Sequence, residues 1–449
     1  MSVRLLSKLA APAPRYTSYP TAPHFHAGID AAVYRGWLEE LPDGASLSLY
    51  LHIPYCDRLC WFCACHTKQT LSYAPVQRYL EALKREIATV GAAVGRRRMV
   101  SAVHFGGGSP TLLRADDMVA LSEALSSSFE IPVGCEISVE IDPSDMDEAR
   151  FDALARAGMT RASLGVQDFE PAVQKAINRM QSYEQTRWAV ESVRERGVAS
   201  VNLDVLYGLP HQTEATLTRT LEQVLTLSPD RIALFGYAHV PWFKKHQTMI
   251  DEAALPDIAA RYGQAQLAAR LVQAAGYVPV GLDHFSKPSD GLAQACVEGR
   301  LRRNFQGYTV DEADALIGLG ASAVGRLPQG YVQNLSATGQ YERALVEGGL
   351  AVARGIGFTP EDRARSFVIE RLMCDFGFSG VELRDRFGPA GKVILREAQD
   401  LAAMDEDGLF LRQGDNFVVP QEARPFVRNV AARFDTYLRN GQARHSQAI

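Results

Sequence analysis

Short apolar runs alternate with longer amphipathic stretches from about residue 47 to residue 285. The apolar runs predict strands over Leu47–His52, Ser101–Phe105, Glu136–Ile141, Arg161–Leu164, Ser200–Leu206, Arg231–Tyr237 and Val278–Leu282. The amphipathic stretches predict helices over Val76–Val90, Ala115–Ser127, Glu184–Arg196, Ala215–Leu227 and Ile258–Ala275. This alternation indicates an α/β fold with a parallel sheet and crossover helices. It fits a full or partial (β/α) TIM-like barrel whose functional site lies at the carboxyl ends of the strands.

The pattern becomes mostly helical after about residue 300. Helices are predicted over Asp311–Ala323, Gln340–Glu347 and Pro360–Cys374, and a strand pair over Leu409–Arg412 and Asn416–Val419. The segment Gln413-Gly414-Asp415 has the turn chemistry to join that pair. We therefore expect an N-terminal extension over residues 1–40, a barrel domain over 41–300 and a smaller, mainly helical C-terminal domain over 301–449.

The segment Pro14–Ala22 is too rich in proline and β-branched residues for a helix. Its two tyrosines, one arginine and several hydroxyls suggest a segment folded over something, and we expect it to cover the active site. A disordered terminus is the alternative.

Composition and charge exclude several classes of protein. The chain has 449 residues, 47% of them hydrophobic and 22% charged, with a net charge of −5. These values are typical of a globular protein with more than one core and give no general attraction to nucleic acid or acidic membranes. A balanced total still allows a basic pocket. We see no signal peptide and no apolar run of roughly 18 residues that would span a membrane.

Four of the seven cysteines lie within ten residues, in the stretch Cys56–Cys65. Clustering and an odd count indicate a metal site in a reducing cytoplasm rather than a disulfide framework. Cys56, Cys60 and Cys63 follow an apolar strand with the spacing C-x3-C-x2-C, which lets one loop bind a compact iron–sulfur cluster through thiolates. Structural zinc would more often use two separated pairs of ligands.

Three thiolates leave one iron of a [4Fe–4S] cube without a protein ligand. In this respect the loop resembles the radical S-adenosylmethionine (SAM) superfamily, in which SAM chelates the open iron and is cleaved to a 5′-deoxyadenosyl radical. Cys65 is either a fourth ligand, since an extended segment would point it to the same side as Cys63, or a supporting or substrate-side residue.

A glycine-rich turn, Gly106-Gly107-Gly108-Ser109, follows the second predicted strand. Consecutive glycines allow close approach of the backbone to a ligand, and no Lys-Ser/Thr ending supports a phosphate loop. Further polar residues stand at predicted strand ends or shortly after one: Glu140, Asp142, Gln167, Asp168, Arg179 and Asp204. Repeated over several strands, they predict a polar funnel above the barrel.

A resemblance to one family then covers almost the whole chain. The segments that carry it are Pro14–Ala22, Cys56–Cys65, Gly106–Thr111, Ser138–Pro143, Gly165–Phe169, Asn202–Pro210, Tyr237–His239, Asp283–Phe285, Arg303–Tyr308 and Phe434–Leu438. They resemble the oxygen-independent coproporphyrinogen III oxidases (dehydrogenases).

The resemblance implies roles residue by residue. Cys56, Cys60 and Cys63 would ligate the cluster. Contacts to the SAM on it would come from Tyr50, Gly107, Glu140 and Val324. Contacts to a second SAM would come from Phe62, Gly108, Ser109, Gln167, Arg179, Asp204 and Ala238. Tyr50 and Gln306 match residues linked to activity. The family more commonly has threonine at Ser109 and isoleucine at Val324, which are conservative differences.

The implied reaction converts two propionates of coproporphyrinogen III to vinyl groups in anaerobic haem biosynthesis, giving protoporphyrinogen IX with loss of CO2. Removing hydrogen from an unactivated carbon requires radical chemistry, which a cofactor must supply. The enzyme would also need an electron donor for the cluster and an electron acceptor, and the resemblance suggests a monomer. Carboxylates of the substrate require cationic partners, for which the candidates are Arg15, Arg179, Arg302 and Arg303.

Three alternatives remain. A haem chaperone of the same superfamily would share the barrel and the three cysteines. A radical SAM methyltransferase would also fit two bound SAM molecules. A structural zinc protein would use the cysteines without any redox chemistry.

Overall fold

The computed structural model describes residues 11–95 and 98–440 of the chain. Residues 1–10 of the expected N-terminal extension and residues 441–449 of the expected C-terminal domain lie outside the described residues. Among the described residues, no helix has both the length and the apolar character needed to cross a membrane.

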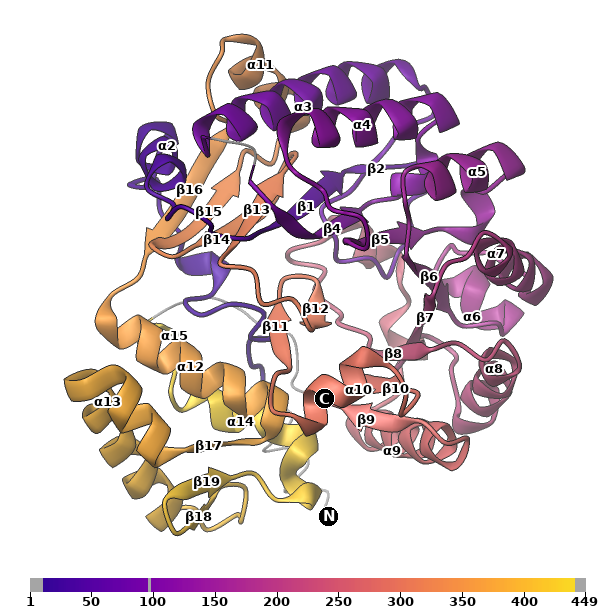
Figure 1. Ribbon diagram of the computed structural model, residues 1–449. Helices are drawn as coiled ribbons and strands as arrows, with labels where there is room; N and C mark the ends of the chain where they lie inside the picture. The colour runs from indigo at the N-terminus through magenta and orange to yellow at the C-terminus, as the bar shows by residue number, and fades with distance from the viewer. Residues whose placement is uncertain (1–10, 96–97, 441–449) are drawn as a thin grey trace.

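The main sheet is a curved arc of 12 strands in the described part of the chain (Figure 1). From one edge to the other these are β16 (Val352–Gly357), β15 (Gly330–Asn334), β14 (Val324–Leu327), β13 (Ala315–Leu319), β1 (Leu47–Ile53), β4 (Val100–Gly107), β5 (Glu136–Ile141), β6 (Arg161–Gln167), β7 (Ser200–Tyr207), β8 (Arg231–Gly236), β10 (His284–Ser286) and β9 (Val278–Val280). The run from β13 through β1 to β8 is parallel. The strands at both edges are antiparallel. The α/β fold with a partial barrel is therefore confirmed.

Alternation along the strands divides the sheet into an apolar outer face and a polar inner face. In β1, Leu47, Leu49 and Leu51 belong to the main hydrophobic core, whereas Tyr50 and His52 lie on the opposite face. The same period of two places Glu140 on the inner face of β5 and Asp204 on that of β7. The strands thus form a barrel with a polar interior.

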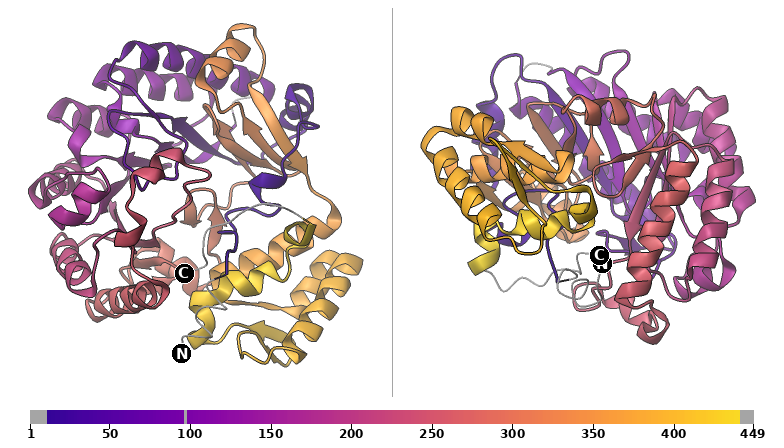
Figure 2. Two further views of the ribbon diagram at one scale, coloured as in Figure 1. Left: turned by 180° about the vertical axis from the view of Figure 1, so that it is seen from behind. Right: turned by 90° about the horizontal axis from the view of Figure 1, so that it is seen from below.

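Helices cover the apolar outer face, as crossover connections between parallel strands require (Figures 1 and 2). They are α3 (Ala74–Ala93), α4 (Ala115–Ser128), α5 (Glu148–Arg156), α6 (Pro171–Ala176), α7 (Tyr183–Glu195), α8 (Glu214–Thr226) and α9 (Ile258–Ala274), with α2 (Ala31–Glu39), α10 (Gly291–Val297) and α11 (Thr338–Val346) at the margins. All of the strands and helices predicted between residues 47 and 282 are present, β5 with the predicted ends and the others with shifted ends, whereas α5, α6 and β10 were not predicted.

The prediction of a helix over 311–323 is wrong, because Ala315–Leu319 forms β13, which pairs in parallel with β1. All five residues of β13 are buried, and a short apolar run buried on both faces is typical of a central parallel strand. The expected domain boundary at residue 300 would separate these paired strands. The barrel sheet continues to Gly357, and we place the boundary after it.

The remaining C-terminal residues form a separate helical unit at the open side of the arc (Figure 1). It contains α12 (Pro360–Asp375), α13 (Gly380–Ala403), α14 (Val427–Ala432) and α15 (Thr436–Asn440), with a small sheet of β17 (Gly377–Ser379), β19 (Asn416–Val418) and β18 (Leu411–Gln413). The predicted hairpin is confirmed by the pairing of Gln413 with Asn416. A second hairpin, β11 (Arg302–Asn304) with β12 (Gly307–Thr309), lies within the arc.

The segment Pro14–Ala22 is ordered between the two units. Tyr16 and Tyr19 belong to the core of the C-terminal unit, and the Tyr16 hydroxyl donates to Asp435 over 3.1 Å. From the same segment, Arg15 donates to the carbonyl of Gly236 at the end of β8, over 3.2 Å. These contacts support the expectation of a segment folded over other parts of the protein, and its cover of the active site stays a prediction.

Candidate functional site

The cysteine loop begins where β1 ends, and Cys56 closes the short strand β2 (Tyr55–Cys56), which pairs with β3 (Lys68–Gln69). Backbone groups of the loop are held from one side by the segment after α6. The Trp61 N–H donates to the carbonyl of Ile177 over 2.9 Å, and Asn178 Nδ2 donates to the carbonyl of Leu59 over 2.9 Å. The loop therefore has a fixed path before any ligand binds.

The segment after β8 holds the other side of the same loop, and Figure 2 shows it crossing the middle of the arc. Gln247 Nε2 donates to the carbonyls of Phe62 (2.9 Å) and Ala238 (3.1 Å). A ring nitrogen of His246 lies 2.7 Å from the Cys63 carbonyl, and Lys244 Nζ donates to the Cys65 carbonyl over 2.8 Å. The sequence analysis missed Lys244, His246 and Gln247, because no local pattern links them to cysteines about 180 residues earlier.

Arg179 supplies a positive charge beside the cysteines. Its Nη1 lies 3.7 Å from Cys60 Sγ and 3.0 Å from Asp142 Oδ2, and Asp142 also binds Arg58 at 2.7 Å. Burial acts to raise the pKa of Asp142, but the two guanidinium groups hold it below its ordinary value. Arg179 can thus stabilise a thiolate at Cys60 while its other contacts keep it in place.

The glycine-rich turn lies directly against the cysteine loop. The Gly108 N–H donates to the carbonyl of Ile53 (2.7 Å) and the Ser109 N–H to that of Tyr55 (2.9 Å). A Cβ at Gly108 would stand 2.7 Å from the Tyr55 oxygen and 3.0 Å from Cys56 Sγ. The absence of a side chain is therefore required for this approach.

Glu140 links the turn to the polar interior. Its Oε2 accepts from the Gly107 N–H over 3.0 Å, and its Oε1 lies 3.2 Å from a ring nitrogen of His104. Burial acts to raise the pKa of Glu140, but the contact with His104 brings it below its ordinary value. A charged carboxylate is thereby held against the backbone of the glycine-rich turn.

Tyr50 and His52 lie next to this carboxylate on the inner face of β1. The Tyr50 hydroxyl is 2.9 Å from His52 Nδ1, and the Tyr50 and His104 rings stack at 5.7 Å. Burial raises the pKa of Tyr50 well above its ordinary value and lowers that of His52 to about 4. At neutral pH both side chains are therefore uncharged.

The other predicted residues occupy different parts of the funnel. Asp204, on β7, accepts from Asn202 Nδ2 over 2.7 Å, and burial raises its pKa to about 6. Gln167 ends β6 with φ of +66°, a left-handed conformation, which turns the chain at the strand end. Asp168 is instead buried and accepts hydrogen bonds from Gln212 and Thr220. It therefore stabilises the fold and does not contribute to the polar funnel.

Two predicted positions, Gln306 and Val324, lie apart from the cysteine loop, and a third, Ser109, contacts it through its backbone N–H only. Gln306 lies in the turn of the β11–β12 hairpin and lines a small polar cavity together with His104 and Arg161. Val324 starts β14, and its backbone is in close contact with Gly318 of β13. The hydroxyl of Ser109 bonds to Thr111 (3.1 Å) and Asp145 rather than pointing freely at the loop.

The residues of the loop fit an iron–sulfur cluster on three counts. Three thiols stand on one short loop, a guanidinium lies beside one of them, and the neighbouring turn lacks side chains at the point of closest approach. Soft thiolate donors suit iron–sulfur clusters. Among the described residues, no group of three His, Cys, Asp or Glu side chains is arranged to hold a single metal ion. The fit therefore depends on the donor chemistry of the thiols and on the close approach of Gly108 to Cys56.

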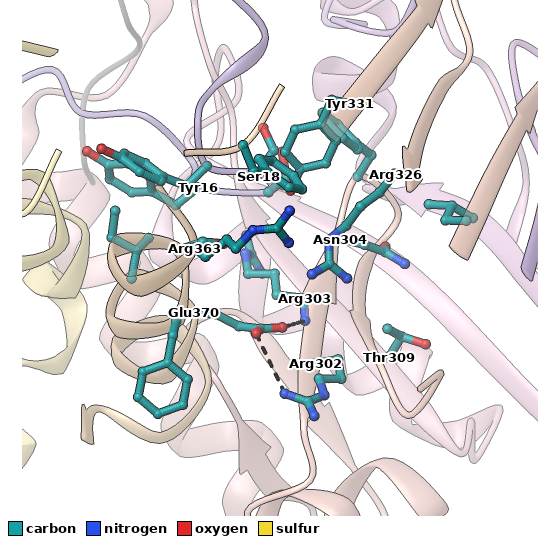
Figure 3. Close-up of a pocket in the computed structure, with 18 of the residues that line it drawn as sticks. Tyr16, Ser18, Arg302, Arg303, Asn304, Thr309, Arg326, Tyr331, Arg363 and Glu370 are labelled. Atoms are coloured by element: carbon teal, nitrogen blue, oxygen red, sulfur yellow. Dashed lines mark hydrogen bonds and ion pairs between the residues drawn. The ribbon is translucent and has the colours of Figure 1, made fainter. Parts of the chain in front are cut away.

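A cavity of about 400 Å³ lies between the β11–β12 hairpin and α12 (Figure 3). We call it the hairpin cavity. Arg302, Arg326 and Arg363 extend into it, and Arg302 pairs with Glu370 at 3.6 Å. It contains charges of both signs, since Asp311 and Glu312 also line it.

Comparisons with known proteins agree with these observations. Residues 50–224 match the model of the Radical SAM superfamily. The chain is 48% identical over 436 residues to an oxygen-independent coproporphyrinogen III oxidase of Bradyrhizobium diazoefficiens, covering 97% of both chains. It is 39% identical over 432 residues to the Pseudomonas aeruginosa protein of the same name, covering 95% of this chain and 93% of that one.

Among solved structures, the coproporphyrinogen III oxidase HemN of Escherichia coli, described as a radical SAM enzyme, superimposes with a TM-score of 0.91. The two share 35% identity over 97% of this chain and 99% of that one.

Proposed function

This chain belongs to the oxygen-independent coproporphyrinogen III oxidases of the radical SAM superfamily, and from this premise we propose how its residues carry out the reaction. The enzyme converts two propionate side chains of coproporphyrinogen III to vinyl groups, giving protoporphyrinogen IX in anaerobic haem biosynthesis. The observation that carries the proposal is the three-cysteine loop packed against Gly108, in a chain that aligns with oxidases over nearly its full length. The haem chaperone alternative is not favoured by these relatives.

The loop would hold a [4Fe–4S] cluster through Cys56, Cys60 and Cys63. When bound, the cluster and SAM would supply the radical chemistry needed to remove hydrogen from an unactivated carbon, which no side-chain acid or base can do. Cys65 is our candidate for a supporting role, because a fourth thiolate would close the iron site that SAM needs.

Glu140 and the glycine turn would bind the SAM held on the cluster. The Glu140 carboxylate is charged and already oriented by the Gly107 N–H, so it can accept hydrogen bonds from an ammonium group without reorganising. Tyr50 and Val324 complete the proposed set of contacts. The hydroxyl of Tyr50 stays protonated and can act as a donor in this enclosed site.

A second SAM would lie beside the first, and the residues proposed to bind it share the carboxyl ends of the strands or the loops next to them: Phe62, Gly108, Ser109, Gln167, Arg179, Asp204 and Ala238. The contact of Gln247 with the carbonyls of Phe62 and Ala238 supports a fixed spacing between two of them. Tyr50 and Gln306 are the proposed catalytic residues, and both reach the inner face of the barrel.

The clustered cysteines support a cytoplasmic location, and the family resemblance supports a monomer. An electron donor to the cluster and an acceptor for the electrons released with CO2 are required by the stoichiometry.

The test is an anaerobic assay of cluster-reconstituted protein with coproporphyrinogen III, SAM and a low-potential reductant, analysed by mass spectrometry. We expect protoporphyrinogen IX together with 5′-deoxyadenosine and methionine. Deoxyadenosine without decarboxylated porphyrin would rule out the substrate but keep the radical chemistry, and a methylated product would favour a methyltransferase.

Two matched cysteine variants test the ligand assignment. Cys56→Ser should lose the visible absorbance of the cluster and all three products. Cys65→Ser should keep the absorbance, because it leaves the three proposed ligands intact. Loss of absorbance in both variants would make Cys65 a ligand.

A further inference from the structure

A second cavity of about 400 Å³ lies between the carboxyl end of β8, helix α9 and the C-terminal unit. We call it the arginine cavity, because five arginines of the described residues line it: Arg15, Arg261, Arg303, Arg424 and Arg428. They come from four separate parts of the chain. Only the tertiary structure brings them together.

Backbone carbonyls orient three of these guanidinium groups. Arg15 donates to the carbonyl of Gly236 (3.2 Å), Arg261 to that of Tyr237 (2.8 Å) and Arg428 to that of Pro14 (3.0 Å). Arg428 also donates to the carbonyl of Ala13. The neutral carbonyl that holds Arg15 leaves the positive charge of this guanidinium available to an anion.

Arg303 lies over the ring of Tyr308, at 4.4 Å from its centroid, and donates to the carbonyl of Arg15 over 3.4 Å. Its Nε and Nη1 are buried without a hydrogen-bond partner among the described residues. Buried donors without partners are costly. A ligand with acceptor oxygens would satisfy them.

Negative charge in the wall of the arginine cavity is already engaged. Two of the described lining residues are acidic, Asp283 and Asp375. Asp283 accepts from His284 over 2.7 Å, and Asp375 pairs with Arg371 at 2.6 Å. Burial acts to raise the pKa of Asp283, but His284, Arg303 and Arg15 lower it to about 2. Five arginines in the wall still outnumber these two acidic residues. Burial, and to a smaller extent the nearby charges of Arg15 and Arg303, lowers the pKa of Arg428 to about 9.

The arginine cavity adjoins the candidate active site. Its wall includes Tyr207 and Ala238 at the ends of β7 and β8, and Ala238 bonds to the same Gln247 amide that holds the cysteine loop. A ligand that fills this cavity would therefore extend toward the cluster loop.

We propose that Arg15, Arg303, Arg261 and Arg428 form a carboxylate clamp that binds the propionates of the substrate that are not reacting in a given turnover. This inference rests on the proposed function and deepens it. A propionate that leaves as CO2 must give up its negative charge, and an ion pair to arginine would oppose that loss. The arginines are thus best placed to bind the propionates that are not reacting, where they hold the tetrapyrrole ring of the substrate in position.

The structure also distinguishes among the arginines considered from the sequence. Arg179 is paired with Asp142 at 3.0 Å and Arg302 with Glu370 at 3.6 Å, so a carboxylate already neutralises each. Arg15 and Arg303 remain as clamp residues. Arg261 and Arg428 were not predicted.

The test uses the reconstituted enzyme with Arg15→Gln, Arg15→Lys and Arg303→Gln variants. We expect KM for coproporphyrinogen III to rise roughly 10-fold or more in the glutamine variants, since each loses a charge-assisted hydrogen bond. Arg15→Lys should recover part of the loss because it keeps the charge. Arg187→Gln, an exposed change on α7, is the matched control and should leave KM for coproporphyrinogen III unchanged.

Binding of an unreactive probe separates the clamp from the chemistry. Coproporphyrin III should bind to the enzyme more tightly than its tetramethyl ester, and the preference should shrink in Arg303→Gln. Equal binding of acid and ester would overturn the clamp, as would a larger KM effect from Arg302→Gln, which changes the hairpin cavity.

Failure of the clamp and failure of the proposed function give different results. Turnover of coproporphyrinogen III by the unmodified enzyme with unchanged KM in both glutamine variants would overturn the clamp alone. Absence of turnover with arginine-dependent binding of coproporphyrin III would overturn the proposed reaction and keep a tetracarboxylate site.

Discussion

At the scale of single residues, the site depends on glycines that lack a side chain as much as on charged side chains. Gly108 allows the backbone of one loop to reach the sulfur of another, and Gly107 adopts a φ of +118°, which favours glycine. Arg179 and Glu140 place one positive and one negative charge on either side of this contact. Each is held by partners before any cofactor arrives, so little reorganisation is needed on binding.

Gly108→Ala should therefore impair the site. The added Cβ would meet the Tyr55 oxygen at 2.7 Å and Cys56 Sγ at 3.0 Å, and overpacking of this kind costs roughly 1–3 kcal/mol. We expect less iron bound after reconstitution and weaker SAM binding, measured by iron analysis and by titration. Gly291→Ala is the matched control, because a Cβ there meets no atom within 4 Å. Equal iron content in the two variants would contradict the close approach.

At the scale of elements, buried polar contacts set how strands and helices meet. Glu86 of α3 accepts from the Gly320 N–H (2.6 Å), from Asn334 Nδ2 (2.6 Å) and from the Tyr341 hydroxyl (2.5 Å). These donors follow β13, end β15 and lie in α11, so one carboxyl joins three elements to α3. The network explains why β13 lies in the barrel despite its distance in sequence.

Glu86 should also impose a pH dependence on stability. Burial raises its pKa from 4.5 to about 7, so the unfolded chain loses this proton before the folded protein does. The contribution to folding is then largest below pH 4.5 and declines as the pH rises to about 7, by up to about 3 kcal/mol. We expect Glu86→Gln to flatten the decline of Tm between these values.

Thermal unfolding of the Glu86→Gln variant across this pH range is the measurement. Glu81→Gln, an exposed change on the same helix, should keep the slope of the unmodified protein. An unchanged slope in Glu86→Gln would show that another group titrates.

At the scale of the whole molecule, the N-terminal segment connects the barrel to the C-terminal unit. Tyr16 and Asp435 are 419 residues apart in sequence and 3.1 Å apart in space. Arg15 of the N-terminal segment and Arg428 of the C-terminal unit both line the arginine cavity. The cavity therefore exists only when the two units and this segment are assembled.

Tyr16→Phe should loosen that assembly. It removes the donor to a buried carboxylate, a contact worth roughly 1.5–3 kcal/mol when one partner is charged. We expect faster tryptic cleavage after Arg15, measured by the mass of the shortened chain, and a higher KM for coproporphyrinogen III. Tyr183→Phe is the control, because it removes an exposed hydroxyl contact to Thr226 within the barrel domain. Equal cleavage rates in the two variants would contradict the connecting role.

The sequence by itself determined the α/β alternation, the cysteine spacing and the glycine turn. These features are local. The alternation of apolar and polar residues along a strand, the three thiols on one loop and the consecutive glycines can each be recognised within a few residues. They were enough to indicate a partial barrel and a radical SAM chemistry.

Tertiary structure alone decided which distant residues meet. Three features depend on contacts between residues that are far apart in the sequence. They are the position of β13 beside β1, the contacts of Gln247 and His246 with the cysteine loop, and the arginine cavity. A short apolar run cannot show whether it will be a helix or a buried strand, because burial on all sides removes the periodic signal. Nor can a single arginine show whether a carboxylate will neutralise it: Arg302 and Arg303 are adjacent, yet the fold pairs Arg302 with Glu370 and leaves nitrogens of Arg303 without a partner among the described residues.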